Sequence, residues 1–416
     1  MNKVILVGAN ILKDGMMDYY MEELENLAVA SELEVLYTMT QQMHRVNPPT
    51  YIGKGKVVEI KSYVDNLDAD MVVFNNELSG SQIRNLENVL DVRVIDRTML
   101  ILDIFAKRAK TKEAMLQVEI AQLAYMRPRL VGLTESLNRQ QGGIGSKGPG
   151  EKKLELDRRR IDHETYRLTK ELEEVVSSRK IQRKNRNKSK IKKIAIVGYT
   201  NAGKSTLLNK LIDITDKQSD KKVFAKDMLF ATLETSTRQI ELNSHKQFII
   251  TDTVGFVSNL PHNLVESFKS TLEEITEADY LIHVVDSSHE FHKQQIEVTN
   301  KTLEEIGVHD IPMLYVYNKY DLNKTTLTPS FFPNVIVSLL QEKGVKDVLS
   351  FIEQELFNDL TEVKLLIPFS KGALMSLINE QSNIIKREYS DEGTLLTVEL
   401  TQAKLVEYEE FIKKED

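Results

Sequence analysis

The chain has 416 residues, a formal net charge of −7 and no cysteine, and 41% of its residues are hydrophobic. At roughly 150 residues per domain, this length predicts two to four domains, and the composition excludes a disordered or collagen-like chain. The lack of cysteine excludes disulfide frameworks, thiolate metal sites and catalytic thiols. No apolar run approaches the roughly 20 residues that span a bilayer. The first ten residues also lack the basic region of a signal peptide, so we expect a cytoplasmic protein with no membrane span.

The charges are distributed unevenly along the chain. Residues 97–193 contain 25 Lys and Arg against 12 Asp and Glu, a net of +13, while the rest carries −20. Such a basic middle between acidic parts favours a polyanionic partner such as nucleic acid. A long solvated helix rich in lysine is the alternative interpretation.

Residues 1–98 predict a small α/β domain. Apolar strand-like runs alternate with amphipathic stretches near 17–31, 55–65 and 80–90, a rhythm typical of a parallel sheet covered on both faces. The expected strands are Val4–Val7, Leu33–Tyr37, Met71–Phe74 and Val92–Ile95. Neither Gly8 nor Gly53–Lys56 completes a G-x-G-x-x-G fingerprint, so we interpret these glycines as turn residues.

Residues 99–178 predict a long antiparallel helical hairpin. Leu102, Ala109, Leu116 and Leu123 recur every seven residues until Pro128, and a second heptad series from Leu154 to Val175 follows a glycine-rich loop. Because the other heptad positions, such as Arg158 and Thr165, are poorly apolar, we expect a local hairpin rather than a dimeric coiled coil, and a protein that is monomeric when free. The second helix, 152–178, would be about 40 Å long.

The loop between the two helices is suited to contact phosphates. It has five glycines in the ten positions Gly142–Glu151, which expose backbone amides, and basic residues flank it. The expected RNA-binding residues are Arg139, Gly142, Gly143, Gly145, Lys147, Lys152, Lys153 and Arg158. A mobile linker is the alternative. The run 179–193, with nine basic residues in fifteen and no acid, predicts a basic linker to the next domain.

A phosphate-binding loop follows the basic linker. The apolar strand Ile194–Val197 leads into Gly198, Tyr199, Thr200, Asn201, Ala202, Gly203, Lys204, Ser205 and Thr206, which match G-x-x-x-x-G-K-[ST] at the start of an amphipathic helix. In such loops the backbone amides and the helix N-terminus hold the β-phosphate. Lys204 would reach the β and γ oxygens, and Ser205 would offer its hydroxyl to Mg²⁺.

Two further motifs appear in the order that a GTPase needs. A strand ends in Asp252, Thr253, Val254 and Gly255, where the aspartate can hold Mg²⁺ through water and the glycine amide can contact the γ-phosphate. A later strand ends in Asn318-Lys319-Tyr320-Asp321, matching N-K-x-D. Asp321 can accept hydrogen bonds from N1–H and the amino group of guanine. Adenine lacks both donors, and leaving the carboxylate unpaired would be costly. The bound nucleotide is therefore expected to be GTP or GDP. Residues 194–358 are the predicted GTPase domain.

The segment between these motifs must contain the switch threonine, and spacing alone leaves Thr232, Thr235 and Thr237 open. This residue ligates Mg²⁺ and contacts the γ-phosphate until hydrolysis. Position 256 is Phe, where many GTPases carry a water-orienting glutamine. Since an apolar side chain cannot orient water, we expect slow hydrolysis by the protein alone and stimulation by a partner.

These residues together resemble the HflX GTPases, ribosome-associated members of the Obg–HflX group. The resemblance covers nearly the whole chain and rests on Tyr51–Lys56, Gln117–Leu123, the Gly142–Glu151 loop and the G-domain motifs. It implies that Phe230, Ala231, Thr232, Leu233 and Glu234 form the switch segment, with Thr232 as the Mg²⁺ ligand beside the catalytic groups Lys204, Asp252 and Gly255. It also implies that Ser338, Leu339 and Leu340 form the last guanine-contact loop.

The resemblance implies a function as well. Members bind the large ribosomal subunit and its rRNA and separate stalled or stress-arrested ribosomes under nucleotide control. The alternative is an RNA-binding or remodelling protein with a secondary nucleotide site that tolerates ATP. A tRNA-modifying or signalling GTPase would need catalytic extras that the chain lacks. Residues 361–416, strand-like at Val363–Ile367 and Leu395–Leu400 around a helix-like middle, predict a small C-terminal α/β domain.

Overall fold

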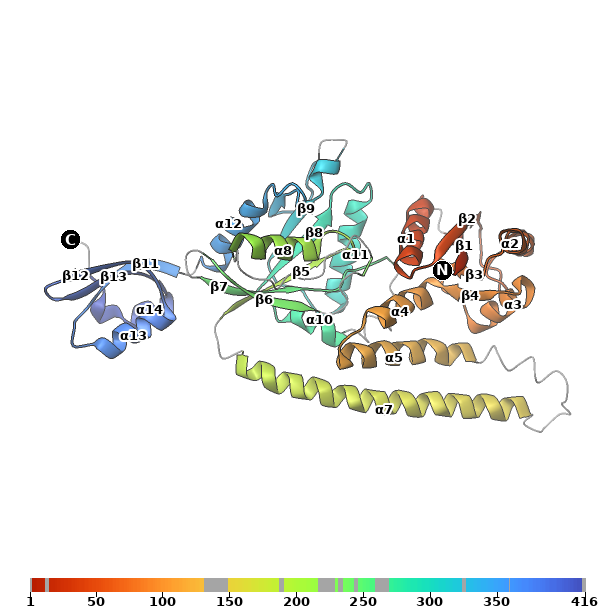
Figure 1. Cartoon of the computed structure of the whole chain (residues 1–416), viewed down its shortest axis with the longest axis horizontal. Helices are drawn as coiled ribbons and strands as arrows, with labels where there is room; N and C mark the ends of the chain where they lie inside the picture. The colour runs from red at the N-terminus through yellow and green to blue at the C-terminus, as the bar shows by residue number, and fades with distance from the viewer. Residues whose placement is uncertain are drawn as a thin grey trace.

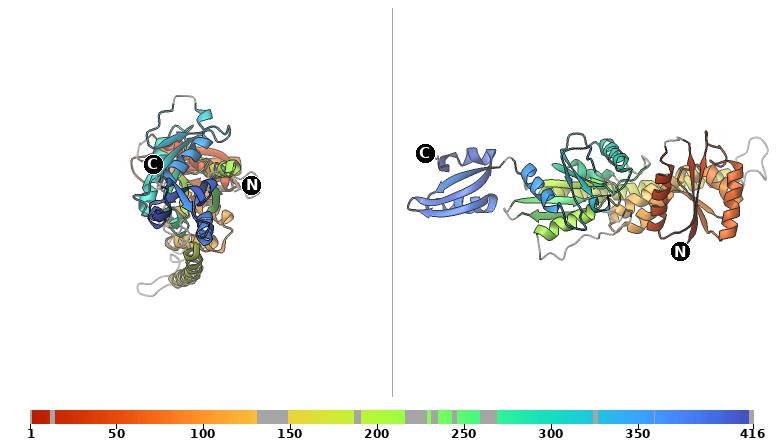
Figure 2. Two further views of the ribbon diagram at one scale, coloured as in Figure 1. Left: turned by 90° about the vertical axis from the view of Figure 1, so that its left-hand side faces the viewer. Right: turned by 90° about the horizontal axis from the view of Figure 1, so that it is seen from above.

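The computed structural model describes residues 2–11, 15–130, 149–186, 191–215, 229–230, 235–242, 246–258, 269–323, 327–358 and 360–413. Three bodies follow one another along its long axis: an N-terminal domain, a central domain and a small C-terminal domain (Figures 1 and 2). A long helix lies below the first two bodies in Figure 1. This arrangement confirms the predicted multidomain α/β fold with a P-loop domain.

The N-terminal domain is a four-stranded parallel sheet of order β2-β1-β3-β4 with helices on both faces. It consists of β1 (Lys3–Asn10), α1 (Met17–Ala30), β2 (Glu34–Gln42), α2 (Lys54–Leu67), β3 (Met71–Phe74), α3 (Gly80–Leu90), β4 (Arg93–Asp96) and α4 (Arg97–Arg108). Val4–Val7 are completely buried, as an apolar run in a doubly covered parallel strand should be. All four predicted strands and three predicted helices of this domain are therefore confirmed.

The predicted start of the first hairpin helix is wrong. The heptad series was expected to run unbroken from about residue 99, but the chain forms two helices, α4 and α5 (Lys112–Met126). Thr111 caps α5 by accepting a hydrogen bond from the main-chain nitrogen of Ala114, which fixes the break between the helices. Leu102 lies in the core cluster of the N-terminal domain, so α4 packs with that domain.

The hairpin itself consists of α5 and α7 (Pro149–Arg186). Lys112 at the start of α5 pairs with Glu171 at 2.7 Å, and Arg127 after its end bonds Asp162, so the two helices run antiparallel as predicted. With 38 residues, α7 is about 57 Å long, rather than the expected 40 Å. It continues to Arg186, so the first half of the predicted basic linker is helical. The glycine-rich loop up to residue 148 lies outside the described residues.

The central domain is a six-stranded sheet of order β10-β9-β8-β5-β7-β6, in which only β6 is antiparallel to its neighbour. It consists of β5 (Lys192–Gly198), α8 (Lys204–Thr215), β6 (Ser236–Glu241), β7 (Gln247–Asp252), α10 (Lys269–Thr276), β8 (Tyr280–Asp286), α11 (His292–Glu305), β9 (Met313–Asn318), β10 (Asn334–Ile336) and α12 (Val345–Leu356). The carboxyl ends of β5, β7 and β9 carry the three predicted motifs to one edge of the sheet, where open α/β sheets bind ligands.

The C-terminal domain is a three-stranded antiparallel sheet of order β11-β13-β12 with two helices. It consists of β11 (Leu360–Ile367), α13 (Gly372–Gln381), β12 (Asn383–Ser390), β13 (Gly393–Thr401) and α14 (Gln402–Glu407). The sequence predicted β11, the helical middle and β13, but not β12, whose side chains are mostly exposed and give no apolar run. Lys246 of the central domain pairs with Glu399 of β13 at 3.0 Å, which joins the two domains, and with Glu353 of α12 at 3.4 Å.

Candidate nucleotide-binding site

The predicted phosphate-binding loop occupies the turn between β5 and α8. Gly198, Asn201 and Gly203 have φ values of +144°, +62° and +105°, so the chain passes through the left-handed region three times in six residues. Such a turn directs successive amides toward one point, in line with the N-terminus of α8. A Cβ atom at Gly203 would lie 2.3 Å from Nδ2 of Asn318, so only glycine fits there.

Lys204 lies within this loop, and its side chain is almost fully buried. Its Nζ donates hydrogen bonds to the carbonyl oxygens of Gly198 at 3.1 Å and Tyr199 at 2.8 Å, which curl the loop around the amine. Burial lowers the pKa of Lys204 to about 8, although the nearby Asp252 carboxylate acts in the opposite direction. The cationic form is therefore less favoured here than in water.

Ser205 and Asp252 bring two oxygen ligands together. The hydroxyl of Ser205, one residue into α8, donates to Oδ2 of Asp252 at 2.6 Å. Asp252 ends β7 and is completely buried. A hydroxyl and a carboxylate at this distance form the oxygen-only donor set that a small divalent cation prefers. The pair thus fits a metal ion beside the phosphate loop.

The D-x-x-G segment lies directly against the phosphate loop. The carbonyl of Phe256 accepts from the main-chain nitrogen of Thr200 at 2.8 Å, and its own nitrogen donates to Gly198 at 3.2 Å. A Cβ atom at Gly255 would lie 2.7 Å from Cα of Thr200 and 2.9 Å from Nζ of Lys204. Gly255 therefore faces the lysine amine at a distance that no other residue type allows.

Thr253, Val254 and Phe256 hold this segment by turning their side chains away from the loop. Thr253 donates its hydroxyl to the carbonyl of Ile196 at 2.6 Å, and Val254 joins a cluster formed with the N-terminal domain. Phe256 packs among apolar side chains of the central domain and is 4% exposed. No water-orienting group is placed at position 256.

The N-K-x-D loop is tied to the phosphate loop and to the last predicted loop. Asn318 donates through Nδ2 to the carbonyl of Ala202 at 2.9 Å and accepts at Oδ1 from the nitrogen of Leu339 at 3.2 Å. The hydroxyl of Ser338 donates to Oδ1 of Asp321 at 2.5 Å. These bonds tie three sequence-distant loops to one another.

Lys319 and Leu340 belong to the same two loops. Lys319 has a φ of +61°, and its Nζ pairs with Asp286 of β8 at 2.7 Å, a partner that the sequence analysis missed. Leu340 is exposed, whereas Leu339 is buried. The Lys319–Asp286 pair therefore links the N-K-x-D loop to the end of β8.

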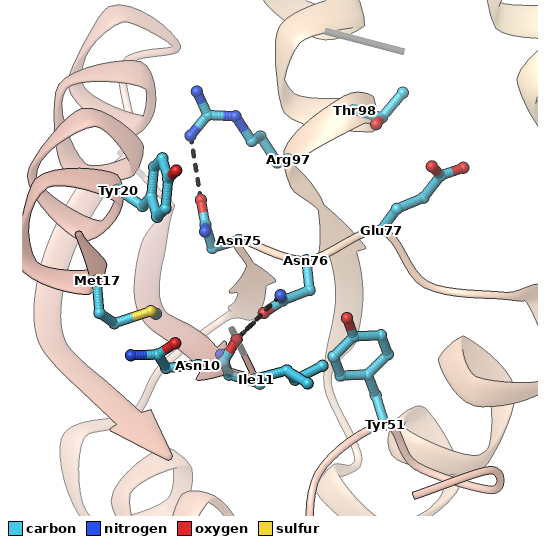
Figure 3. Close-up of a pocket in the computed structure, with 11 residues that line it drawn as sticks. Asn10, Ile11, Met17, Tyr20, Tyr51, Asn75, Asn76, Glu77, Arg97 and Thr98 are labelled. Carbon is cyan, nitrogen blue, oxygen red and sulfur yellow. Dashed lines mark hydrogen bonds between the residues drawn. The ribbon is translucent and has the colours of Figure 1, made fainter. Parts of the chain in front are cut away.

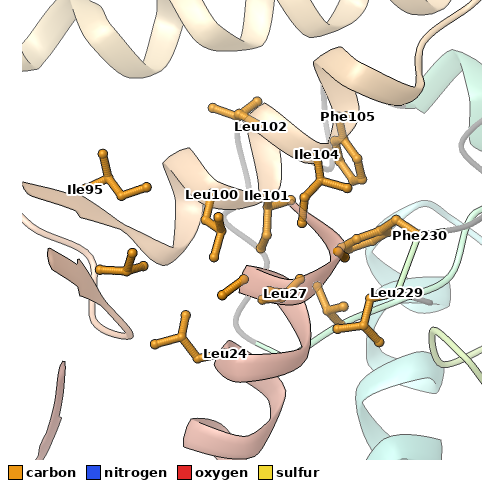
Figure 4. Packing of buried hydrophobic residues seen from close by; sticks show 14 of the residues in the cluster. Leu24, Leu27, Ile95, Leu100, Ile101, Leu102, Ile104, Phe105, Leu229 and Phe230 are labelled. Carbon is orange, nitrogen blue, oxygen red and sulfur yellow. The ribbon is translucent and has the colours of Figure 1, made fainter. Parts of the chain in front are cut away.

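Part of the predicted switch segment is described. Phe230 donates from its main-chain nitrogen to the Thr200 hydroxyl at 2.9 Å, while its ring packs edge-on against Phe105 of α4 with centroids 4.7 Å apart (Figure 4). Leu229 lies in the same cluster with side chains of α1 and α4. The predicted residues Ala231, Thr232, Leu233 and Glu234 fall outside the described residues.

The predicted RNA-binding residues belong to a different part of the molecule. Arg158 is an exposed side chain of α7, and Lys152 and Lys153 lie in the first turns of that helix. The remaining five, from Arg139 to Lys147, fall outside the described residues. Figure 1 shows the first turns of α7 at the end of the hairpin away from the central domain.

Two features near the site gave no signal in the sequence. His283 in β8 is buried, and burial together with the Lys204 charge lowers the pKa of its imidazole to about 3, so it stays neutral. Tyr199 of the phosphate loop directs its side chain into the N-terminal domain and bonds Glu23 of α1. Both depend on contacts between distant segments, which periodicity and motifs do not report.

A cavity of about 350 Å³ lies in the N-terminal domain, at the carboxyl ends of β1, β3 and β4 (Figure 3). Asn10, Tyr20, Tyr51 and Asn75 are among its lining residues, and Arg97 donates to Oδ1 of Asn75 at 3.1 Å. It is separate from the phosphate loop of the central domain.

Family models match three consecutive parts of the chain between residues 18 and 319. They are described as GTP-binding GTPase N-terminal (residues 18–106), GTP-binding GTPase Middle Region (108–186) and 50S ribosome-binding GTPase (193–319). The phosphate loop, the D-x-x-G segment and the N-K-x-D loop fall in the third match or at its end. With this fold and site, the chain is a P-loop GTPase, an enzyme that binds and hydrolyses GTP.

The particular family follows from full-length relatives. The chain is 45% identical over 382 residues to "GTPase HflX" of Caldanaerobacter subterraneus, covering 92% of this chain and 87% of that one. It is 37% identical over 401 residues to "GTPase HflX" of Escherichia coli, covering 95% and 92%. The chain therefore belongs to the HflX family of GTPases, which confirms the resemblance. A solved GTP-binding protein of Sulfolobus solfataricus with GDP is similar at 24% identity and a TM-score of 0.45, covering 85% of this chain and 98% of that one.

Among the described residues, no helix is both long and apolar enough to cross a membrane.

Proposed function

We propose that the phosphate loop and its neighbours divide the recognition of GTP between them. Amides of Gly198–Thr206 hold the β-phosphate, Lys204 contacts the β and γ oxygens, and the Gly255 amide contacts the γ-phosphate. Asp321 accepts from guanine N1–H and the amino group. The buried amine, the close Gly255 and the three joined loops support these roles.

We further propose a bound Mg²⁺. Ser205 and Asp252, the latter through water, would hold it together with Thr232 of the switch segment, and the 2.6 Å hydroxyl–carboxylate pair supports this set. The ion, when bound, neutralises charge on the β and γ oxygens. Removing the ion with a chelator should weaken GTP binding more than GDP binding. Only GTP carries the γ-phosphate that Thr232 contacts while it ligates the ion.

We infer that the partner is the large ribosomal subunit, including its rRNA, and that the protein dissociates stalled or stress-arrested ribosomes in a nucleotide-dependent way. The family model over residues 193–319 is described as a 50S ribosome-binding GTPase, which supports this proposal. The observation that carries it is the antiparallel α5–α7 hairpin, in which α7 presents exposed cations such as Arg158.

The experiment is co-sedimentation with purified large subunits under a non-hydrolysable GTP analogue, GDP or no nucleotide. We expect tight binding with the analogue only, and dissociation of intact ribosomes as measured by light scattering. Lys204→Ala should abolish the nucleotide effect. Arg158→Glu should weaken binding and lower its salt dependence, whereas Lys346→Glu on the exposed face of α12 should not.

Equal affinity in all three nucleotide states would contradict the switch. It would favour the second hypothesis, an RNA-binding protein whose nucleotide site is secondary. Competition between GTP and ATP also distinguishes the two hypotheses. If the first holds, ATP should not displace GTP, because Asp321 should reject adenine.

A further inference from the structure

A three-residue turn connects the hairpin to two different neighbours at the end of α5. This turn is the 3-10 helix η1 (Arg127–Arg129), which follows α5 directly and precedes the glycine-rich loop in the chain. Its first residue, Arg127, pairs with α7, and its last residue, Arg129, pairs with the N-terminal domain. The turn therefore joins the two helices of the hairpin to the domain beside them.

Arg129 contacts the N-terminal domain through several atoms at once. Its side chain is 15% exposed, and its guanidinium lies 3.4 Å from the ring centroid of Tyr125, on which it stacks. The Nη2 atom donates to the carbonyl oxygen of Leu78 at 2.9 Å and to Oε1 of Glu77 at 3.1 Å. The same nitrogen lies 3.4 Å from Oδ2 of Asp96. We call Glu77, Leu78, Asp96 and Arg129 the hairpin anchor.

Asp96 is the most deeply buried member of the hairpin anchor. It ends β4, is completely buried, and caps α4 by accepting from the main-chain nitrogen of Met99 at 3.0 Å. Its other oxygen accepts from the main-chain nitrogen of Leu78 at 3.0 Å. A buried carboxylate needs bonded partners and an opposite charge, and Arg129 supplies that charge. The turn η1 is therefore tied to the point where β4 passes into α4.

The main chain of η1 also lies against the N-terminal domain. Gly80 is the first residue of α3, and a Cβ atom there would lie 2.5 Å from the carbonyl oxygen and 2.7 Å from Cα of Arg129. Only glycine lets two backbones approach this closely. The position of the turn is thus set by a backbone contact as well as by the hairpin anchor.

Arg127 connects this turn to α7. Its Nε donates to Oδ1 of Asp162 at 2.5 Å and its Nη2 to Oδ2 at 3.2 Å, a forked pair with a defined geometry. Because α7 begins at Pro149, thirteen residue steps precede Asp162, so about 20 Å of this helix projects beyond the end of α5 (Figure 1). The projecting part carries three of the predicted RNA-binding residues, Lys152, Lys153 and Arg158.

We propose that Arg129 and Asp96 are positioning residues for RNA binding by the hairpin. Through η1 and the Arg127–Asp162 pair, they fix the direction in which the first turns of α7 project from the N-terminal domain. This inference rests on the proposed function, in which the hairpin contacts rRNA. Arg129 itself is enclosed and already bonded, so its contribution is the direction of the helix and not a phosphate contact.

The physical reason is preorganisation of a long lever. A small rotation at the base of the projecting helix becomes a large displacement of the cations farther along it. Cations that are already held in the bound direction lose less conformational freedom when they meet their phosphates. Without the hairpin anchor, the same contacts can form only after the helix has been ordered.

The first experiment measures the direction of α7 in the free protein. The chain has no cysteine, so Val58→Cys on α2 and Leu156→Cys on α7 place two spin labels at exposed positions and nowhere else. Double electron–electron resonance should give one narrow distance distribution for this pair. Arg129→Met, which removes the guanidinium, should broaden or shift the distribution. Lys346→Met, which removes an exposed cation of α12, should leave it unchanged.

The second experiment measures affinity for purified large subunits with the GTP analogue at several salt concentrations. Arg129→Met should weaken binding by about tenfold at each concentration, because the phosphate contacts remain but must first be ordered. The salt dependence should keep the wild-type slope, since no phosphate contact has been removed. Arg158→Glu should instead lower that slope, and Lys346→Met should change neither quantity.

Further variants separate positioning from loss of folding. GDP affinity and thermal unfolding verify that each variant is folded. Arg129→Lys keeps a charge beside Asp96 but loses the forked, stacked geometry, so its loss of affinity should be smaller than that of Arg129→Met. If Arg129→Met does not fold, Gly80→Ala displaces the main chain of η1 and leaves the guanidinium in the protein. It should shift the label distance and weaken binding in the same direction.

An unchanged distance distribution in Arg129→Met would overturn the proposal, and so would wild-type affinity in that variant. A loss of affinity with a lower salt slope would also overturn it, because Arg129 would then be a direct phosphate contact. Wild-type protein that does not bind large subunits would instead contradict the proposed function. The label distances are measured without ribosomes, so they decide in either case whether the hairpin anchor fixes α7.

Discussion

Lys204 shows how burial tunes a single residue of the site. Its amine is enclosed by the phosphate loop, and its pKa is lowered to about 8 in the free protein. Phosphate oxygens placed beside it would raise that pKa again. Between the two pKa values, binding takes up a proton, so affinity must fall as pH rises through that interval.

We therefore expect GDP and GTP affinity to be constant below about pH 7 and to fall, by at most about tenfold per unit, above about pH 8. Titration calorimetry in two buffers of different ionisation enthalpy measures the proton uptake directly. Lys204→Arg, which stays protonated, should bind without that slope. A wild-type affinity independent of pH from 7 to 9 would contradict the assigned contact.

Phe256 stands where many GTPases carry a water-orienting glutamine. Its side chain is buried in the central core, and both of its main-chain polar groups bond the phosphate loop. Phe256→Gln should consequently leave single-turnover hydrolysis no faster, while burying an amide lowers the free energy of unfolding by about 1–3 kcal/mol. Phe331→Gln, at a half-buried position of the same domain, serves as the comparison for stability. Acceleration by Phe256→Gln would show that the segment moves before reaction.

At the scale of the elements, the α5–α7 hairpin allows the contributions of apolar packing and ion pairing to stability to be compared. Leu168 is the buried residue among the described side chains of α7, while the Lys112–Glu171 pair is largely exposed on the lysine side. Leu168→Ala should destabilise the hairpin by about 2–4 kcal/mol, seen as faster amide exchange in α5 and α7. Lys112→Ala should have almost no effect, because exposed ion pairs contribute little. Equal effects would mean that electrostatics holds the hairpin together.

At the scale of the whole molecule, one face of the N-terminal domain borders the nucleotide site. Helices α1 and α4 pack on Leu229 and Phe230 (Figure 4), and Tyr199 of the phosphate loop bonds Glu23 of α1. Helix α2 packs on the opposite side of the sheet, in a different core cluster.

Replacing GDP by a non-hydrolysable GTP analogue should thus change amide exchange in α1 and at the start of α4, but not in α2 or in the C-terminal domain. Hydrogen-exchange mass spectrometry resolves these segments. Phe105→Ala, which removes the ring against Phe230, should reduce the response in α4 without removing GDP binding. A nucleotide response confined to the central domain would show that the domains are uncoupled.

Contiguous residues were enough to determine the chemistry of this protein. Gly198–Ser205, Asp252–Gly255 and Asn318–Asp321 each encode a strand end and its turn locally, so their order in the chain predicted a GTPase fold and site. The apolar runs of the N-terminal sheet, such as Val4–Val7, were equally readable because burial on both faces leaves a continuous signal.

Only the tertiary structure decided how the domains meet that site. The heptad series concealed the break between α4 and α5, because α4 buries Leu102 against the N-terminal domain and not in the hairpin. Tyr199 and Glu23 are 176 positions apart, and neither the loop motif nor helix periodicity says where a tyrosine hydroxyl finds its acceptor. Such contacts follow from packing of the complete chain, since a buried polar group must be satisfied by whatever segment the fold brings beside it.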